Sequence, residues 1–263
     1  MSAPPVPSFF ASTANVFRFQ LLRIVRGRKL RFGVIAVLLV VIGTAVARFT
    51  GGAAHPEQVF ETGVRTGFMH MLVYLLPFLF ISGTIAEEVE SRTFTFIALR
   101  PTGRFALTTG KYGAGVAVAT ALITAGLVLL FLCCFITTPA LLGEHIKEFL
   151  RVLLACLLLV WAYGAMCMMW GALAVEAAGI VSALYLGVVE FAFSYVPLLK
   201  FISMNHYATA IAGYHDDVSE MLQRLELDVP AALCVVIIVV VTALFYGLAA
   251  LVVSASEYRT SKA

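Results

Sequence analysis

Long apolar runs separated by short polar segments dominate the pattern along the chain. A helix needs about 20 apolar residues to cross the hydrocarbon core of a membrane, although flanking arginines can shorten that requirement. Six runs qualify: residues 32–47, 67–85, 113–137, 152–175, 178–199 and 229–254. They do not alternate with a period of two, so they predict helices and not the strands of a barrel. The predicted fold class is all-α, a polytopic membrane protein with six transmembrane helices.

Composition agrees with this pattern. Of the 263 residues, 61% are hydrophobic and only 13% are charged. That charged share is about half of what is usual for a globular protein. A soluble chain this apolar could not cover its own surface, so a soluble enzyme, a disordered chain and a nucleic-acid binder are excluded. The expected surroundings are membrane lipid, with no nucleic-acid partner.

The distribution of basic residues predicts the orientation. Twelve of the 18 Lys and Arg residues fall in the N-terminal segment, in the loop between the second and third runs, and in the C-terminal tail. Basic loops stay in the cytoplasm, so both termini are predicted to be cytoplasmic. The tripeptide 45–47 resembles a signal-peptide cleavage site, and cleavage there would leave five spans and an external N-terminus. The preceding basic region is too long for a signal peptide, so we expect the first span to be retained.

The N-terminal segment, residues 1–31, is predicted to be a tail followed by an amphipathic helix. Apolar and basic residues interleave between positions 14 and 31. One interpretation is an ordinary basic flank lying in the inner headgroup region. The other is a helix that also touches a cytoplasmic partner. Residues 32–263 form the six-span domain.

The loop at about 86–112 carries the most information. It opens with Glu87, Glu88 and Glu90, continues through a part-apolar stretch at 93–99, and turns at 100–104. A fully solvated loop would not need the apolar side chains of that stretch. They predict a short helix packed on another surface.

This loop resembles that of the permease subunits of type-2 ABC exporters. The resemblance rests on one set of positions, together with the six spans and the N-terminal helix: Glu87, Glu88, Glu90, Thr93, Pro101, Arg104, Gly110 and Lys111. Arg92 departs from the pattern, because many members have glycine before the threonine.

The resemblance implies a mechanism. The N-terminal helix would be a connecting helix, and the loop would hold a coupling helix seated on a cytoplasmic ABC ATPase. The permease would work as a dimer with two ATPase copies, in a cytoplasmic (inner) membrane, with its gate between the second and fifth spans and re-entrant helices at about 196–215. The residues assigned to coupling are Glu87, Glu88, Glu90, Thr93, Phe94, Arg100, Pro101 and Arg104. The glutamates are expected to pair with Arg100, with Arg104 or with basic residues of the ATPase, and the alternative is that they are simple solvated charges.

The chain itself carries no nucleotide-binding motif. The spacing from Gly103 to Gly110 is too long for a P-loop, and Lys111 is followed by Tyr112 in place of Ser or Thr. We therefore expect no enzyme activity and no cofactor in this chain, with ATP and Mg bound by the partner ATPase. Two other functions stay open: an ATP-independent channel or secondary carrier, and a membrane anchor for a complex.

Polar residues inside the spans are the remaining candidates. Glu190 is the only carboxylate well inside a span, so its side chain should face protein or water. It is the pathway candidate, and the alternative is a structural carboxylate that is protonated or paired. His70 is expected near the outer end of the second span as an interfacial anchor.

Small and sulfur-containing residues leave two further alternatives. Gly164 and Gly171 lie on one face of the fourth span, which permits close helix approach within one subunit or between two. Four of the cysteines are expected at similar depth, where soft ligands would suit Cu(I), but such residues are also ordinary filler. No metal is assigned to Cys133, Cys134, Cys156 and Cys234.

Overall fold

The computed structural model describes residues 8–50, 55–90, 104–136, 139–194, 196, 199–214 and 230–255. Within these ranges the chain is helical and contains no strand. Six helices are long and apolar enough to cross a membrane, which confirms the predicted number. This architecture indicates a multi-pass membrane protein.

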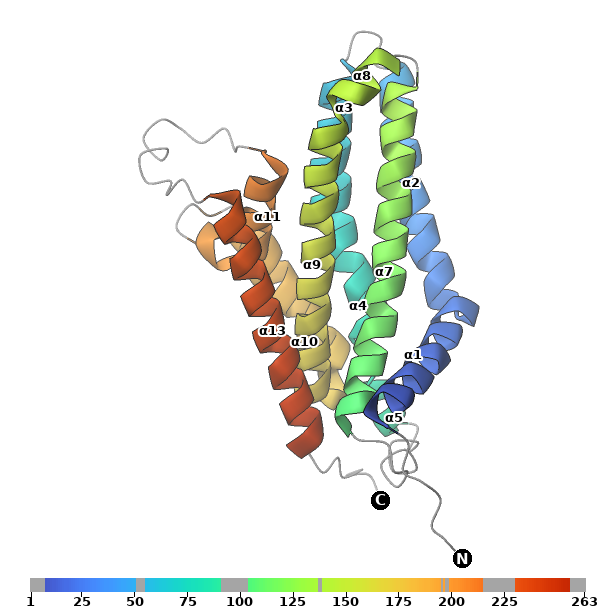
Figure 1. Ribbon diagram of the computed structural model, residues 1–263, viewed down its shortest axis with the longest axis vertical. Coiled ribbons are helices and arrows are strands. Elements are labelled where there is room, and N and C mark those ends of the chain that lie inside the picture. The colour runs from blue at the N-terminus through green and yellow to red at the C-terminus, as the bar shows by residue number, and fades with distance from the viewer. Residues whose placement is uncertain are drawn as a thin grey trace, which may run out of the picture.

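The six spans run up and down the bundle (Figure 1). Span one is α2 (Arg28–Thr50), span three is α7 (Arg104–Phe135), span four is α9 (Ile146–Leu173) and span six is α13 (Ala231–Ala255). Spans two and four are the most buried, and spans one, five and six are the least buried. The short helix α8 (Pro139–Glu144) caps the end of the bundle opposite to the start of α7 (Figure 1).

Span two is assembled from several helical segments. It consists of α3 (Pro56–Thr62), the π-helix η1 (Gly63–Leu72), α4 (Val73–Ile81) and the short helix α5 (Ala86–Glu90). Pro56 stands at the first turn of α3, where its missing N–H group has no cost. Pro77 lies inside α4, where it removes one backbone hydrogen bond.

The N-terminal helix α1 (Phe9–Arg26) packs obliquely across α7, beside α5 (Figure 1). The side chain of Ser8 caps its N-terminus, and Gly27 ends it in an extended conformation. The buried residues Ser12, Gln20 and Ile24 lie on one face. A Cβ atom at position 110 would lie 2.8 Å from the side chain of Val16, so α1 approaches α7 closely there. Placement of α1 at the membrane interface stays a prediction.

Spans two and four meet through glycines. A Cβ atom at Gly164 would lie 2.9 Å from the Ile81 side chain, and one at Gly171 would overlap the backbone carbonyl oxygen of Ser82. Both glycines therefore serve packing within one subunit. This resolves the alternative between an internal contact and a seam between two subunits.

Span five is short and is followed by two short helices. After the break at η2 (Val175–Ala177), it consists of α10 (Ala178–Leu184) and the π-helix η3 (Tyr185–Ala192). The chain then forms η4 (Lys200–Ile202) and α11 (Met204–Ala212), which packs against α9 and α13. Gly213 ends α11 in the left-handed region, with φ of 83°. The membrane depth of this predicted re-entrant segment stays a prediction.

Several predicted boundaries differ from the structure. The break at Glu176 is present, but span two begins at Pro56, span three begins at Arg104, and span five ends at Ala192. The start of α1 and the end of α13 lie at the same end of the bundle, as an even number of crossings requires (Figure 1). The side of the membrane that this end faces stays a prediction.

Candidate functional site

A charged joint surrounds α5, at the end of span two. Glu87 accepts a hydrogen bond of 2.8 Å from Nη2 of Arg23 in α1. Its other carboxylate oxygen binds Nζ of Lys29, near the start of span one. One half-exposed carboxylate thus holds α5 to both N-terminal helices.

The neighbouring Glu88 makes a buried ion pair. Its Oε2 atom lies 2.5 Å from Nζ of Lys111 in span three, and both side chains are almost fully buried. Nζ of Lys111 also donates a hydrogen bond of 2.8 Å to the carbonyl oxygen of Thr84. Because a buried charge is costly unless it is paired and hydrogen-bonded, this geometry locks α5 to span three.

The joint consists of Arg23, Lys29, Glu87, Glu88 and Lys111. It ties the segment that enters the loop at 91–103 to α1, span one and span three. Charged side chains therefore connect α5 to three other helices.

Only part of the predicted coupling set lies in the described residues. Glu87, Glu88 and Arg104 do, whereas the Glu90 side chain, Thr93, Phe94, Arg100 and Pro101 lie outside them. Glu87 contacts Arg23 and Lys29, and Glu88 contacts Lys111. Their predicted pairing with Arg100, with Arg104 or with the ATPase stays a prediction. Arg104 donates a hydrogen bond of 2.8 Å to the carbonyl oxygen of Ser254, joining spans three and six.

A second polar cluster surrounds Glu190 in η3. Its Oε2 atom accepts from the Met204 backbone N–H at 2.9 Å, from the Ser203 hydroxyl at 3.0 Å and from the Tyr163 hydroxyl at 3.1 Å. The carboxylate is fully buried and forms a cap on the N-terminus of α11. It therefore joins spans four and five to the segment that follows span five.

The cluster also reaches span two through His70. Its Nε2 atom lies 3.2 Å from Nδ2 of Asn205, and its Nδ1 atom lies 2.6 Å from the Arg65 carbonyl oxygen. His70 is therefore a contact between η1 and α11, and its role as an interfacial anchor stays a prediction. Tyr74 extends the same side of span two, because its ring packs on that of Tyr163 with centroids 4.8 Å apart.

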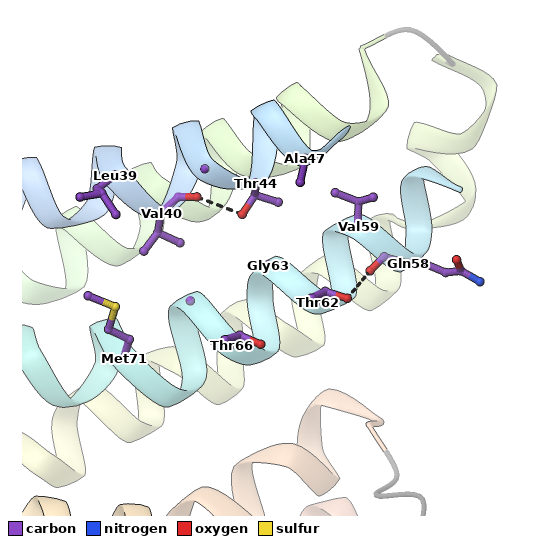
Figure 2. Close-up of a pocket in the computed structure, with 12 residues that line it drawn as sticks. Leu39, Val40, Thr44, Ala47, Gln58, Val59, Thr62, Gly63, Thr66 and Met71 are labelled. Atoms are coloured by element: carbon purple, nitrogen blue, oxygen red, sulfur yellow. Dashed lines mark hydrogen bonds between the residues drawn. The ribbon is translucent and has the colours of Figure 1, made fainter. Parts of the chain in front are cut away.

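A groove between α2 and span two has a different character. It measures about 590 Å³ and is lined mainly by apolar side chains such as Leu39, Val59 and Met71 (Figure 2). The hydroxyl of Thr44 donates to the Val40 carbonyl oxygen, and that of Thr62 donates to the Gln58 carbonyl oxygen. Because these hydroxyls are bonded to their own helices, the groove suits an apolar chain better than a polar group.

The cysteines give no metal centre in the part of the chain that the structure describes. Four are buried, and Cys133 is half-buried. No group of three or more His, Cys, Asp or Glu side chains among the described residues is placed to hold a metal ion. Copper binding gains no support from this arrangement.

The sequence does not indicate most of the contacts in either cluster. The basic residues of the N-terminal segment and Lys111 were visible, but nothing in their spacing pointed to Glu87 or Glu88. A serine followed by the helical stretch 204–212 is the one available signal for the α11 cap at Ser203. No sequence signal distinguishes Tyr163.

No protein-family model and no curated protein matches this chain.

Proposed function

We propose that the chain is the membrane-spanning permease subunit of an ATP-driven exporter. Two copies would form the substrate path in a cytoplasmic (inner) membrane, and two copies of a cytoplasmic ABC ATPase would drive them. ATP and Mg would bind to the ATPase, and this chain would perform no hydrolysis itself. The proposal rests first on the resemblance of the loop after span two to type-2 ABC exporters.

The observation that best supports the proposal is the charged joint around α5. A coupling element must pass force from a cytoplasmic surface to the spans. Glu87 and Glu88 attach α5 to three helices by ion pairs, one of which is buried. This arrangement suits a lever, because α5 contacts three neighbouring helices and one of these contacts is a buried ion pair.

Co-purification tests the proposal. The chain would be extracted from native membranes in mild detergent, and the proteins that co-purify would be identified by mass spectrometry. We expect a P-loop ATPase in near-stoichiometric amount. A chain that is recovered alone after gentle extraction would contradict the exporter assignment, provided that an unrelated ABC complex from the same membranes stays intact.

One observation favours a second candidate, an ATP-independent carrier. Span five ends in a π-helix that contains the buried Glu190, and short helices follow it. Interrupted helices near a buried charge are common in secondary transporters. In that case, the chain reconstituted alone would transport in response to an ion gradient, without added ATPase.

A further inference from the structure

A second groove lies between spans two and five. It measures about 330 Å³, which is at the lower end of the range for small-molecule sites. Span two contributes His70, Tyr74 and Phe78, and span five contributes Leu186, Gly187 and Phe191. Aromatic rings therefore line both sides of the groove.

Glu190 does not line the groove but neighbours the span-five residues that do. Leu186 and Gly187 precede it by about one helical turn in η3, and Phe191 follows it. Tyr163, which donates to Glu190, also packs on Tyr74 of the groove. The ring of Tyr74 in turn lies edge-to-face with that of Phe191, with centroids 6.5 Å apart. The groove and the carboxylate thus share one aromatic wall.

The carboxylate of Glu190 is only half satisfied. The Tyr163, Ser203 and Met204 donors all bind Oε2, and the Asn205 N–H also interacts with the carboxylate, while Oε1 is buried and meets the hydrogen-bond criteria with no donor. Among the described residues, no basic side chain forms an ion pair with Glu190. A carboxylate inside a membrane is costly unless it is protonated or paired, so a cation that reaches Oε1 would take the place of the neutralising proton.

We propose that this groove binds a hydrophobic organic cation. The charged group would lie at Oε1 of Glu190, and the apolar part would pack against Tyr74, Phe78 and Phe191. Aromatic faces attract cations, and this attraction is strongest away from water. Because Glu190 is fully buried, binding requires the rings of the shared wall to move aside. Naming the ligand as the transported substrate rests on the proposed function, whereas the binding itself does not.

Two ions of nearly equal size and opposite charge test the proposal. The purified chain would be placed in nanodiscs of zwitterionic lipid, and saturable binding of tetraphenylphosphonium and tetraphenylborate would be measured, with binding to empty nanodiscs subtracted. We expect the cation to bind at least about tenfold more tightly than the anion. Absent saturable cation binding, or equal affinity for both ions, would overturn the proposal.

Two matched variants test whether the carboxylate of Glu190 binds the cation. E190Q keeps a side-chain acceptor for α11 but removes the negative charge, so cation affinity should fall about tenfold or more. E176Q removes the same charge from the exposed break between spans four and five and should leave affinity unchanged. Equal effects of the two variants would overturn the assignment to Glu190.

A variant that removes one aromatic ring tests the proposal if E190Q fails to fold. Tyr74→Leu keeps the carboxylate and should still weaken cation binding severalfold, because it removes an aromatic face. Unchanged cation binding in Tyr74→Leu would overturn the assignment to this groove. These measurements use the chain without an ATPase, so their failure is distinct from failure of the co-purification experiment.

Discussion

The Nζ atom of Lys111 lies 2.5 Å from the Oε2 atom of Glu88, and both side chains are removed from solvent. Removal of one partner from such a pair leaves an uncompensated buried charge. We therefore expect Lys111→Met to lower the free energy of unfolding by about 3–5 kcal/mol. The measurement is unfolding by SDS titration in mixed micelles.

The double variant Glu88→Gln/Lys111→Met is the control for that experiment. It removes both charges, so it should lose much less stability than the sum of the two single variants. Additive losses would mean that the two side chains do not interact.

Substitution of Glu87 should reduce coupling to the ATPase more than it reduces the stability of the protein. Its contacts with Arg23 and Lys29 are partly exposed to solvent, and such pairs contribute about 0.2–1 kcal/mol each. Under the proposed function, Glu87→Ala should unfold much like the wild type but reduce the ATPase activity of the co-purified complex. Wild-type ATPase activity in this variant would argue against a coupling role for the joint.

Gly171 should tolerate no side chain. An added methyl group would overlap the carbonyl oxygen of Ser82, which is backbone and cannot rotate away. Gly171→Ala should therefore destabilise the protein by about 1–3 kcal/mol. The matched control is Gly43→Ala in α2, where an added Cβ meets nothing within 4 Å and stability should stay equal or rise slightly.

The contacts of His145, at the end of the bundle that carries α8, predict that the stability of the protein depends on pH. Its ring hydrogen-bonds Glu148 at 2.9 Å and contacts Glu57 at 3.2 Å, and these carboxylates raise its pKa above the ordinary value of 6.5, against the opposing effect of burial. A group whose pKa is raised by folding stabilises the protein fully below about pH 6.5, its ordinary pKa. This contribution is lost as the pH rises through the folded-state pKa.

The test compares wild type with His145→Gln across about pH 5 to 8. The wild type should have the higher melting temperature at the acidic end, and the difference should shrink toward the alkaline end. A difference that grows with pH would contradict this assignment.

Ser203 should hold the first turn of α11. Its hydroxyl accepts from the Asn205 N–H and also contacts Glu190. Ser203→Ala should cost about 1 kcal/mol and increase hydrogen exchange of the α11 amides specifically. Ser254→Ala, at the far end of span six, should leave that exchange unchanged.

The spans could be predicted from sequence because the membrane imposes a minimum apolar length on every crossing. The break at Glu176 was visible for a related reason, since a charge interrupts an otherwise apolar run. The start of span two was not visible, because residues 56–66 mix polar and apolar positions and adopt helical structure through their packing against neighbouring spans. The extension of span three back to Arg104 has the same origin, with α1 covering Gly110.

The sequence indicates individual site residues but not the residues that they contact. Glu190 was recognisable as a carboxylate inside an apolar run, whereas its donors Tyr163 and Ser203 come from other segments of the chain. Likewise, Glu88 and Lys111 meet only because spans two and three pack together. Periodicity describes one helix at a time and carries no information about which charges meet across helices.

The glycine contacts between spans two and four determine where the bundle can deform. Gly164 and Gly171 bring span four so close to Ile81 and Ser82 that the two spans cannot slide past each other without a clash. They behave as a single block, and span three is attached to that block through Lys111. Span five is one of the three least buried spans and is joined to this block by the Tyr163–Glu190 hydrogen bond, so we expect rearrangements transmitted from α5 to be largest at that boundary.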